Sequence, residues 1–431
     1  MLESVPAIVR VLVVFVVILI AIRRRFSLGN AFVSGAVLLG LLFGMNLKGI
    51  ALSTLSSLVE AKTMSLSGVV CLILVLSHSL EAAGQMERLL ARFQGLIHRP
   101  KINLVVFPAL IGLLPMPGGA IFSAPMVKTL GKRLRLSGDQ LSYINYWFRH
   151  IWEYWWPLYP GVLLTTALAD LHLWLFVAFL FPLTLVALFS GYLPLRILNN
   201  GAPAPETNPR GPAPSLKPFL KELAPILIVI GGGLGMGSAV SLVLGSGGTG
   251  VDKELGLIAA LVAGILWVWR ANGLSHSQCW DVLKRRQLLQ IFYMVASIMI
   301  FKGVLENSEA VGAISDELLQ VGIPLMPVTV ILPFLVGSVV GITIGFVGTT
   351  FPILISLIQS FGESQHMLAY MMLGLVSGFV GVLLSPLHLC LLLSNEYFET
   401  ALGYVYRHLV TPCGILLASG CAYFFLLQAL F

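Results

Sequence analysis

The residue types most able to do chemistry lie together in one apolar stretch, Asn145 to Pro157, which reads NYWFRHIWEYWWP. A span that enters a membrane near Leu141 would carry Arg149 about 12 Å into a hydrocarbon core of about 30 Å, with Glu153 near the middle. Charges at that depth cost several kcal/mol unless they are paired or face a polar cavity. We therefore interpret Arg149 as a binding group for an anion, because a guanidinium matches a carboxylate or phosphate with two hydrogen bonds.

Two neighbours of this arginine, His150 and Glu153, are candidates for coupling transport to an ion, since histidine titrates near neutral pH. His388, which follows Pro386, is a second histidine of the same kind. The spacing of Arg149 and Glu153 is i,i+4, so a purely structural ion pair on one helix is an alternative. The tryptophans of the stretch could equally form a belt at the membrane interface or a lipid-facing surface.

Glycine-rich interruptions form the second chemical feature. Within the apolar segment 102–130, the run PMPGG at 115–119 cannot continue a helix, because proline lacks an N–H and glycine adds backbone freedom. Basic flanks on both sides predict a re-entrant hairpin, with a single proline-kinked span as the alternative. A second hairpin is predicted at 326–360, with its tip at 341–350.

The hairpin tips supply the remaining predicted substrate ligands. Backbone N–H groups, hydroxyls and half-helix ends are typical partners of an anion. Glycines at such positions also have a structural explanation, the close packing of helices. We predict that the tips complete the site at Arg149 through Gly118, Gly119, Ser123, Thr349 and Thr350.

Composition predicts the class of protein. Of 431 residues, 57% are hydrophobic and only 10% are charged, whereas a soluble protein has about 25% charged residues. The sequence therefore predicts an all-α polytopic membrane protein. Its net charge of +7 comes from basic residues in short loops between apolar runs, which is the positive-inside pattern and not a nucleic-acid signal. The five cysteines show no metal-ligand spacing, so neither a metal nor another cofactor is expected.

Apolar runs locate the elements that position these residues. Spanning helices are predicted near 5–22, 29–47, 67–84, 140–166, 172–197, 222–245, 254–270, 287–304, 366–394 and 408–430. The fourth should be interrupted at Pro157 and Pro160-Gly161, and the ninth around Gly378 to Pro386. A cytoplasmic linker rich in proline and glycine is expected at 199–221.

The two halves of the chain, 1–198 and 222–431, align in an ordered series of matches. Phe107-Pro108 pairs with Leu332-Pro333, for example, and Leu80-Glu81 with Leu305-Glu306. Five spans in each half would invert the second copy, so the prediction is two inverted repeats of five transmembrane helices, each with a re-entrant hairpin and a broken helix. This pattern is typical of secondary transporters. The charge pattern then places both termini outside.

The motifs PMPGGAIFSAPMV (115–127) and NYWFRHIWEYWWPLYPG (145–161) resemble an uncharacterised prokaryotic membrane-protein family of unknown function. As an architecture, the chain resembles the ion-transporter superfamily in which that family is placed. The resemblance implies an elevator mechanism in the cytoplasmic membrane. Both hairpins and the helices at 67–84, 140–166, 172–197, 287–304, 366–394 and 408–430 would move, and the other helices would form a scaffold and a homodimer contact. The tips lack the Ser-Asn-Thr pattern of the sodium-dependent dicarboxylate carriers, which weakly favours protons.

Together these observations predict a secondary-active carrier for a small organic anion, a carboxylate in the first instance, coupled to protons or sodium. No HExxH, GxSxG, Walker or GxGxxG motif follows a predicted strand, so no enzymatic activity is expected. Two other functions stay open. One is a cation/proton antiporter or exporter in which Glu153 binds the cation, and the other is a flippase for a phosphate-headed lipid.

Overall fold

The computed structural model describes residues 5–94, 96, 100–116, 119–196, 216–244 and 250–430. Within these ranges the chain is built of α-helices, with one short 3-10 helix, η2 (Ser364–His366). Most of the predicted linker, 199–221, lies outside the described residues, which resume at residue 216.

Residues 7–196 form the first series of helices. These are α1 (Ala7–Arg23), α2 (Leu28–Leu42), α3 (Leu47–Val59), α4 (Ala61–Ala82), α5 (Gln85–Gln94), α6 (Pro100–Gly112), α7 (Ala120–Arg133), α8 (Gly138–Arg149), α9 (Pro160–Leu168) and α10 (Leu173–Arg196).

Residues 216–430 form the second series of helices. These are α11 (Leu216–Leu244), α12 (Gly250–Ala271), α13 (His276–Leu283), α14 (Arg286–Asn307), α15 (Ala310–Val321), α16 (Leu325–Val340), α17 (Thr343–Ser360), α18 (Met367–Leu383), α19 (Leu389–Tyr397) and α20 (Leu402–Leu430).

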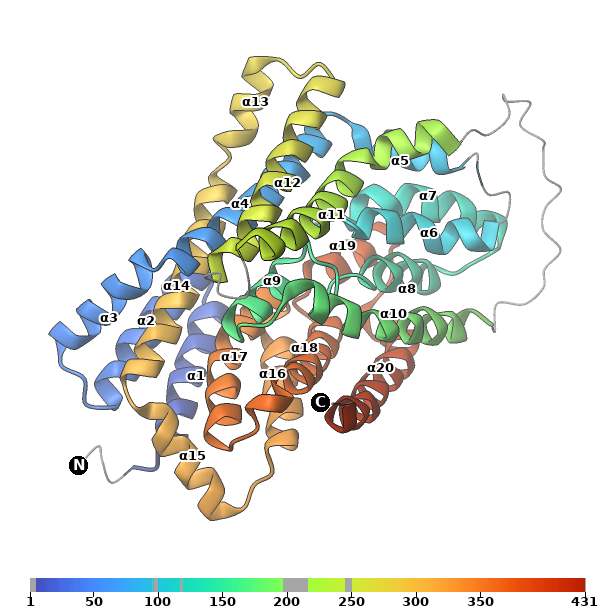
Figure 1. Ribbon diagram of the computed structural model, residues 1–431. Helices are drawn as coiled ribbons and strands as arrows, with labels where there is room; N and C mark the ends of the chain where they lie inside the picture. Colours follow the sequence, from blue (N-terminus) through green and yellow to red (C-terminus); the bar gives the residue numbers. More distant parts are fainter. Residues whose placement is uncertain are drawn as a thin grey trace.

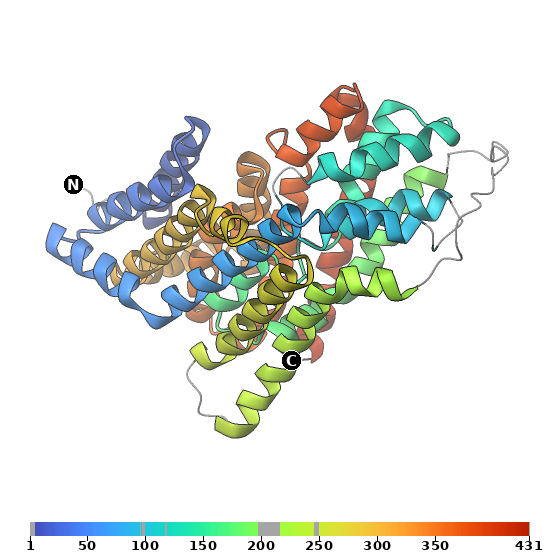
Figure 2. The same cartoon turned by 90° about the horizontal axis from the view of Figure 1, so that it is seen from above.

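The helices gather in two regions that both ribbon views separate. Helices α1, α2, α3 and α14 lie together on one side, and α6, α7, α8 and α10 lie on the opposite side (Figures 1 and 2). In the first region α2 packs against α14, and α4 packs against both α12 and α14. In the second region α6 packs against α7 and α8, α7 and α8 pack against α19, and α10 packs against α20.

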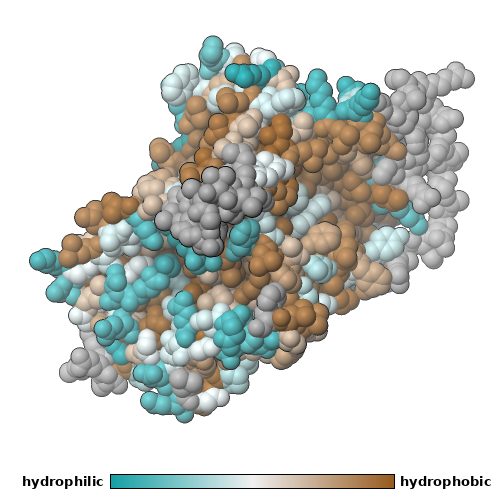
Figure 3. Space-filling model, in the orientation of Figure 1, coloured by the Kyte–Doolittle hydropathy of each residue, from teal (hydrophilic) through white to brown (hydrophobic). Residues whose placement is uncertain are grey.

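The outer surface fits a membrane protein. Hydrophobic side chains cover a broad area of the face in Figure 3, and hydrophilic ones gather toward its upper and lower-left edges. Seven helical stretches of the described chain are long and apolar enough to cross a membrane. They are Ala61–Ala82, Leu173–Leu195, Leu216–Gly235, His276–Asn307, Thr343–Ser360, Ser364–Leu383 and Leu402–Leu430. The chain is therefore a polytopic membrane protein. The helices predicted at 5–22, 29–47 and 254–270 are present as α1, α2 and α12. Of these, α1 with 17 residues and α2 with 15 residues are shorter than the seven spans.

Helix interruptions occur in all four predicted segments, although two of them differ in position. The break between α8 and α9 covers residues 150–159, so it begins before Pro157, and Pro160 opens α9 as its first residue. The break between α18 and α19 is confined to residues 384–388. The interruption expected around Gly378 to Pro386 therefore occurs only at the end of that range. Gly378 and Gly381 continue α18, where they allow close packing against Phe346 of α17 and Phe334 of α16.

Close packing of α16 and α18 depends on glycines from both helices. A Cβ added to Gly337 would overlap the carbonyl oxygen of Gly378, and one added to Gly381 would overlap that of Phe334. These neighbours are backbone atoms, so they cannot rotate away. The helices can approach this closely only without side chains at these positions.

We predict that Gly337→Ala lowers the melting temperature of the purified protein, since overpacking of a tight core costs about 1–3 kcal/mol. Thermal unfolding, monitored by intrinsic fluorescence, measures the melting temperature. Gly414→Ala is the matched control, because Gly414 is an exposed helical glycine with open space around it. An equal loss of stability in both variants would contradict the packing explanation.

Candidate functional site

The four helix interruptions meet in one place. Gly161, in the first turn of α9, contacts Thr343, the first residue of α17. Gly119, which precedes α7, contacts the side chain of Arg149 at the end of α8. His388, which precedes α19, is bonded to His150 directly after α8. The amino ends of α7, α9, α17 and α19 therefore lie around the carboxyl end of α8 and the break that follows it.

Arg149 lies at the centre of this arrangement and is only 2% exposed. Its Nη2 donates a hydrogen bond of 2.6 Å to the carbonyl oxygen of Met116, inside the break between α6 and α7. Its Nε is buried and has no hydrogen-bond partner. A Cβ on Gly119 would overlap the guanidinium, so any larger residue there would displace the Arg149 side chain from its present position. Of the described acidic groups, none lies within 4.0 Å of the guanidinium.

Glu153 does not pair with Arg149. Its Oε1 accepts a hydrogen bond of 2.5 Å from Thr343 Oγ1, and its Oε2 lies 3.8 Å from His150 Nε2. The i,i+4 ion pair that the spacing allowed is absent because α8 ends at Arg149, and the two residues no longer share a helix. Within the described chain the guanidinium thus has no acidic group in direct contact, although the charges of Arg149 and Glu153 attract each other at longer range.

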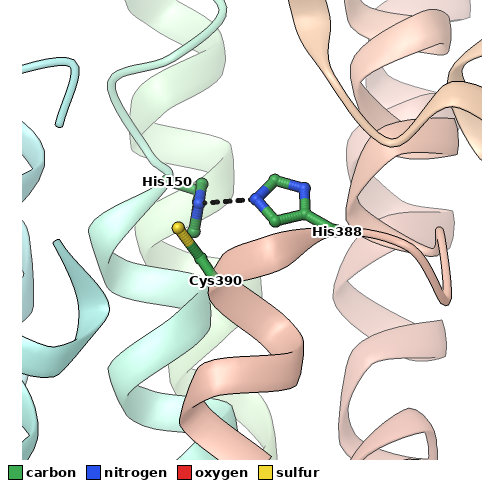
Figure 4. Close-up of side chains that lie close together, drawn as sticks. All are labelled: His150, His388 and Cys390. Atoms are coloured by element: carbon green, nitrogen blue, oxygen red, sulfur yellow. Dashed lines mark hydrogen bonds between the residues drawn. The ribbon is translucent and has the colours of Figure 1, made fainter. Parts of the chain in front are cut away.

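Two histidines face each other across the breaks after α8 and α18. His150 Nε2 and His388 Nε2 are 3.1 Å apart, and the ring planes are nearly perpendicular at 87° (Figure 4). His150 Nδ1 lies 2.6 Å from the carbonyl oxygen of Tyr146. A carbonyl only accepts hydrogen bonds, so Nδ1 of neutral His150 carries the proton, and its Nε2 accepts the hydrogen bond from His388 Nε2. The structure therefore brings together the three predicted coupling residues, His150, His388 and Glu153.

A buried polar network joins three elements beside the arginine. Ser123 donates to Asn145 Oδ1 at 2.6 Å, and Asn145 Nδ2 donates to Ser394 Oγ at 2.9 Å. Asn145 also donates to the carbonyl of Ala120 at 3.0 Å, so α7, α8 and α19 are linked. Our sequence analysis assigned no role to Asn145. Its position four residues before Arg149, on the same face of one helix, is the sequence feature that indicates a place beside the site.

The second tip, predicted at 341–350, is shorter than expected. Thr349 and Thr350 are buried well inside α17, and their hydroxyls donate to the carbonyls of Gly345 and Phe346, within the same helix. The interruption itself is only Gly341 and Ile342, with Gly341 at φ 69°, a left-handed conformation that favours glycine. The threonine at the tip is therefore Thr343. In the first tip, Gly119 and Ser123 lie beside Arg149 and Asn145, and Gly118 lies outside the described residues.

The tryptophans near Arg149 do not form a lipid-facing belt. Trp147 and Trp155 are buried, and Trp152 and Trp156 are partly buried. The indoles of three of them donate to backbone carbonyls of Ala187, Ala109 and Ile151. Trp152, Trp155 and Trp156 also pack on one another. These rings hold the non-helical segment against α6 and α10.

We predict that Asn145→Ala lowers thermal stability, since it removes the buried hydrogen bonds of Asn145 to Ser123, Ser394 and the carbonyl of Ala120. A buried polar group that loses its partner costs about 1–3 kcal/mol. Melting temperature in detergent measures the effect. Asn30→Ala is the control, because it removes one exposed hydrogen bond, to Tyr293, and should change stability little. A control as unstable as the Asn145 variant would contradict the network.

Comparisons with known proteins agree with a membrane family of this kind but name no activity. A search of curated proteins found no match. A family described as "Protein of unknown function (DUF401)" matches residues 6–426, which include all four interruptions and every residue of the site. Because the match covers nearly the whole chain, this protein belongs to the DUF401 family.

Proposed function

We propose that this protein is a secondary-active carrier of a small organic anion, and that Arg149 holds the anion. One observation carries the proposal: a guanidinium at 2% exposure with a free Nε and no acidic group within 4.0 Å among the described residues. A buried charge without a partner is strongly unfavourable, by about 3–5 kcal/mol when one partner of a pair is removed. An anion from solution would supply the missing charge, and a carboxylate fits the fork of a guanidinium.

The surrounding backbone favours the same sign of charge. The amino ends of α7, α9, α17 and α19 converge near Arg149, through Gly119, Gly161, Thr343 and His388. Each helix places partial positive charge and free N–H groups at its amino end. An anion bound among them would satisfy these groups as well as the guanidinium.

Helix packing supports the proposal that the chain contains two repeats. Each helix of the first half has a counterpart ten places later in the second half, so that α2 corresponds to α12 and α4 to α14. When every helix is exchanged for its counterpart, the α2–α14 contact becomes the α12–α4 contact, and α7–α19 becomes α17–α9. It also converts α6–α7 into α16–α17, α6–α8 into α16–α18 and α5–α11 into α15–α1. Such exchange of partners is expected for a pseudo-two-fold axis between the repeats. With the positive-inside charge pattern, it favours inverted repeats with re-entrant hairpins.

The same packing refines the proposed elevator mechanism of the ion-transporter superfamily. Helices α4 and α14, at the predicted spans 67–84 and 287–304, pack chiefly against α12 and α2. We therefore assign them to the scaffold with α1, α2, α11 and α12, and a homodimer would form through this scaffold. The moving part would be α6–α10 and α16–α20. A proton or sodium gradient would drive it, and His150, Glu153 and His388 lie where a coupling ion would bind.

We predict that Arg149→Ala abolishes anion binding and uptake. Truncating one side of a buried charged pair costs about 2–5 kcal/mol, so affinity should fall at least about 30-fold. A thermal-shift screen of the purified protein with carboxylates, sugar acids and phosphonates, at two pH values and with or without sodium, would first find the ligand. Uptake into proteoliposomes would then compare the variant with wild type.

The control for this experiment is Arg407→Ala. Arg407 is exposed, and its guanidinium lies over the exposed ring of Tyr404. It should bind and transport as wild type does. Unchanged uptake by a folded Arg149→Ala protein would overturn the anion-binding role.

Glu153 separates the carrier from a cation/proton antiporter or exporter. In the carrier, Glu153→Gln should keep anion binding and change only its dependence on pH or sodium, because Arg149 remains. In the antiporter, the carboxylate is the cation ligand, and the variant should lose all response to cations while no anion stabilises either protein. Isothermal calorimetry on both proteins measures this. Lipid density beside α8 would instead favour the flippase.

A further inference from the structure

A third side chain completes the histidine pair. Cys390 lies in the first turn of α19, and its Sγ points toward His150 and His388 (Figure 4). The Sγ atom and the ligand nitrogens of the two imidazoles all lie within 4.8 Å of one another, and all three residues are buried. His150 comes from the break after α8, His388 from the break after α18, and Cys390 from the helix that follows it. His150 and His388 are 238 residues apart in sequence. No sequence spacing could have marked this group.

The geometry is close to that of a tetrahedral metal site. Two nitrogen ligands about 2.0–2.1 Å from zinc would be roughly 3.3–3.4 Å apart, and the two Nε2 atoms are 3.1 Å apart. Zinc–sulfur distances of about 2.3 Å would need Cys390 Sγ to move inward by roughly 1 Å. Rotation of one side chain can supply such a shift.

The surroundings of His150 also match a metal ligand. Histidines that bind metals usually donate the other ring N–H to a carbonyl or carboxylate, which fixes the ring and the tautomer. His150 Nδ1 has this partner in the carbonyl of Tyr146, and its Nε2 lone pair points into the cluster. Tyr146 also packs its ring against both imidazoles, so the three rings support one another.

Glu153 offers the fourth ligand and balances the charge. Its Oε2 lies 3.8 Å from His150 Nε2, and a hydrogen bond from Thr343 holds the carboxylate in place. One thiolate and one carboxylate would neutralise a divalent ion, so Arg149 would still require its own anion. The metal and the anion therefore do not compete for the same charge.

We propose that His150, His388 and Cys390, with Glu153 as the fourth ligand, bind a divalent transition metal ion of the zinc class. Thiolate and imidazole ligands select zinc and its neighbours over magnesium and calcium, which prefer oxygen. This inference does not rest on the transport function, because it concerns binding of the ion alone. Protons and metal would compete for the imidazole nitrogens and the thiol, so binding should weaken in acid.

The test uses cobalt(II) as a spectroscopic probe of the full-length protein in detergent, after removal of any polyhistidine tag. We expect one cobalt ion per chain, with visible bands of a tetrahedral site and a thiolate-to-cobalt absorption in the near ultraviolet. Zinc should displace it, and magnesium should not. Bound cobalt without thiolate absorption, or no bound cobalt, in the folded wild-type protein would overturn the proposal.

Variants assign the ligands. Cys390→Ser should abolish the thiolate absorption, and His388→Gln should weaken zinc binding at least about 100-fold, since loss of an outer-shell partner alone costs about 10–100-fold. Cys413→Ser is the matched control, because Cys413 is equally buried but belongs to no such group among the described residues. Retention of the absorption in Cys390→Ser, or its loss in Cys413→Ser, would overturn the assignment. All measurements are made without any transported solute, so they stand apart from the test of anion uptake.

Discussion

The burial of the Arg149 guanidinium is the constraint on which the rest of the site depends. A charge in the interior of so apolar a chain needs polar partners, and a continuous helix cannot provide them because its carbonyls are already bonded within the helix. The interruption after α6 frees the carbonyl of Met116, which accepts from Nη2. The interruption after α8 turns Glu153 away toward Thr343. The breaks and the buried charge therefore explain each other.

Buried hydrogen bonds fix the positions of these breaks relative to one another, both within the first half of the chain and between the two halves. Asn145 links Ser123 on α7 to Ser394 on α19, and His150 meets His388. Tyr159 adds a bond of 2.6 Å to the carbonyl of Gly112, at the end of α6. Because each of these groups would be costly to leave unpaired, they fix one arrangement of the broken ends. Motion of this part of the molecule is accordingly expected to be that of a unit.

The two proposed ligands, an anion and a metal ion, can bind at this centre together because different protein charges would balance them. The anion would balance Arg149 and the helix amino ends, and the metal would be balanced by Cys390 and Glu153. His150 follows Arg149 directly in sequence, so occupation of either site would be felt by the other through the same short segment. Such adjacency gives a physical route by which an ion on the imidazoles could affect the binding of an anion.

The sequence by itself determined the membrane class, the number of interrupted segments and the prominence of Arg149. Those conclusions rest on composition, proline and glycine chemistry, and the cost of a charge in an apolar run, which are local properties. It misplaced Thr349 and Thr350, because a glycine-rich run such as 341–350 does not reveal where a helix restarts. In the structure α17 resumes at Thr343.

Only the tertiary structure decided which side chains meet. The absence of an Arg149–Glu153 pair depends on where α8 ends, and that end is set by packing against α6 through Gly112, Trp152 and Tyr159. The cluster of His150, His388 and Cys390 joins residues from opposite halves of the chain. Contacts between distant segments carry no spacing signal, so a single sequence contains the ligands but not their assembly.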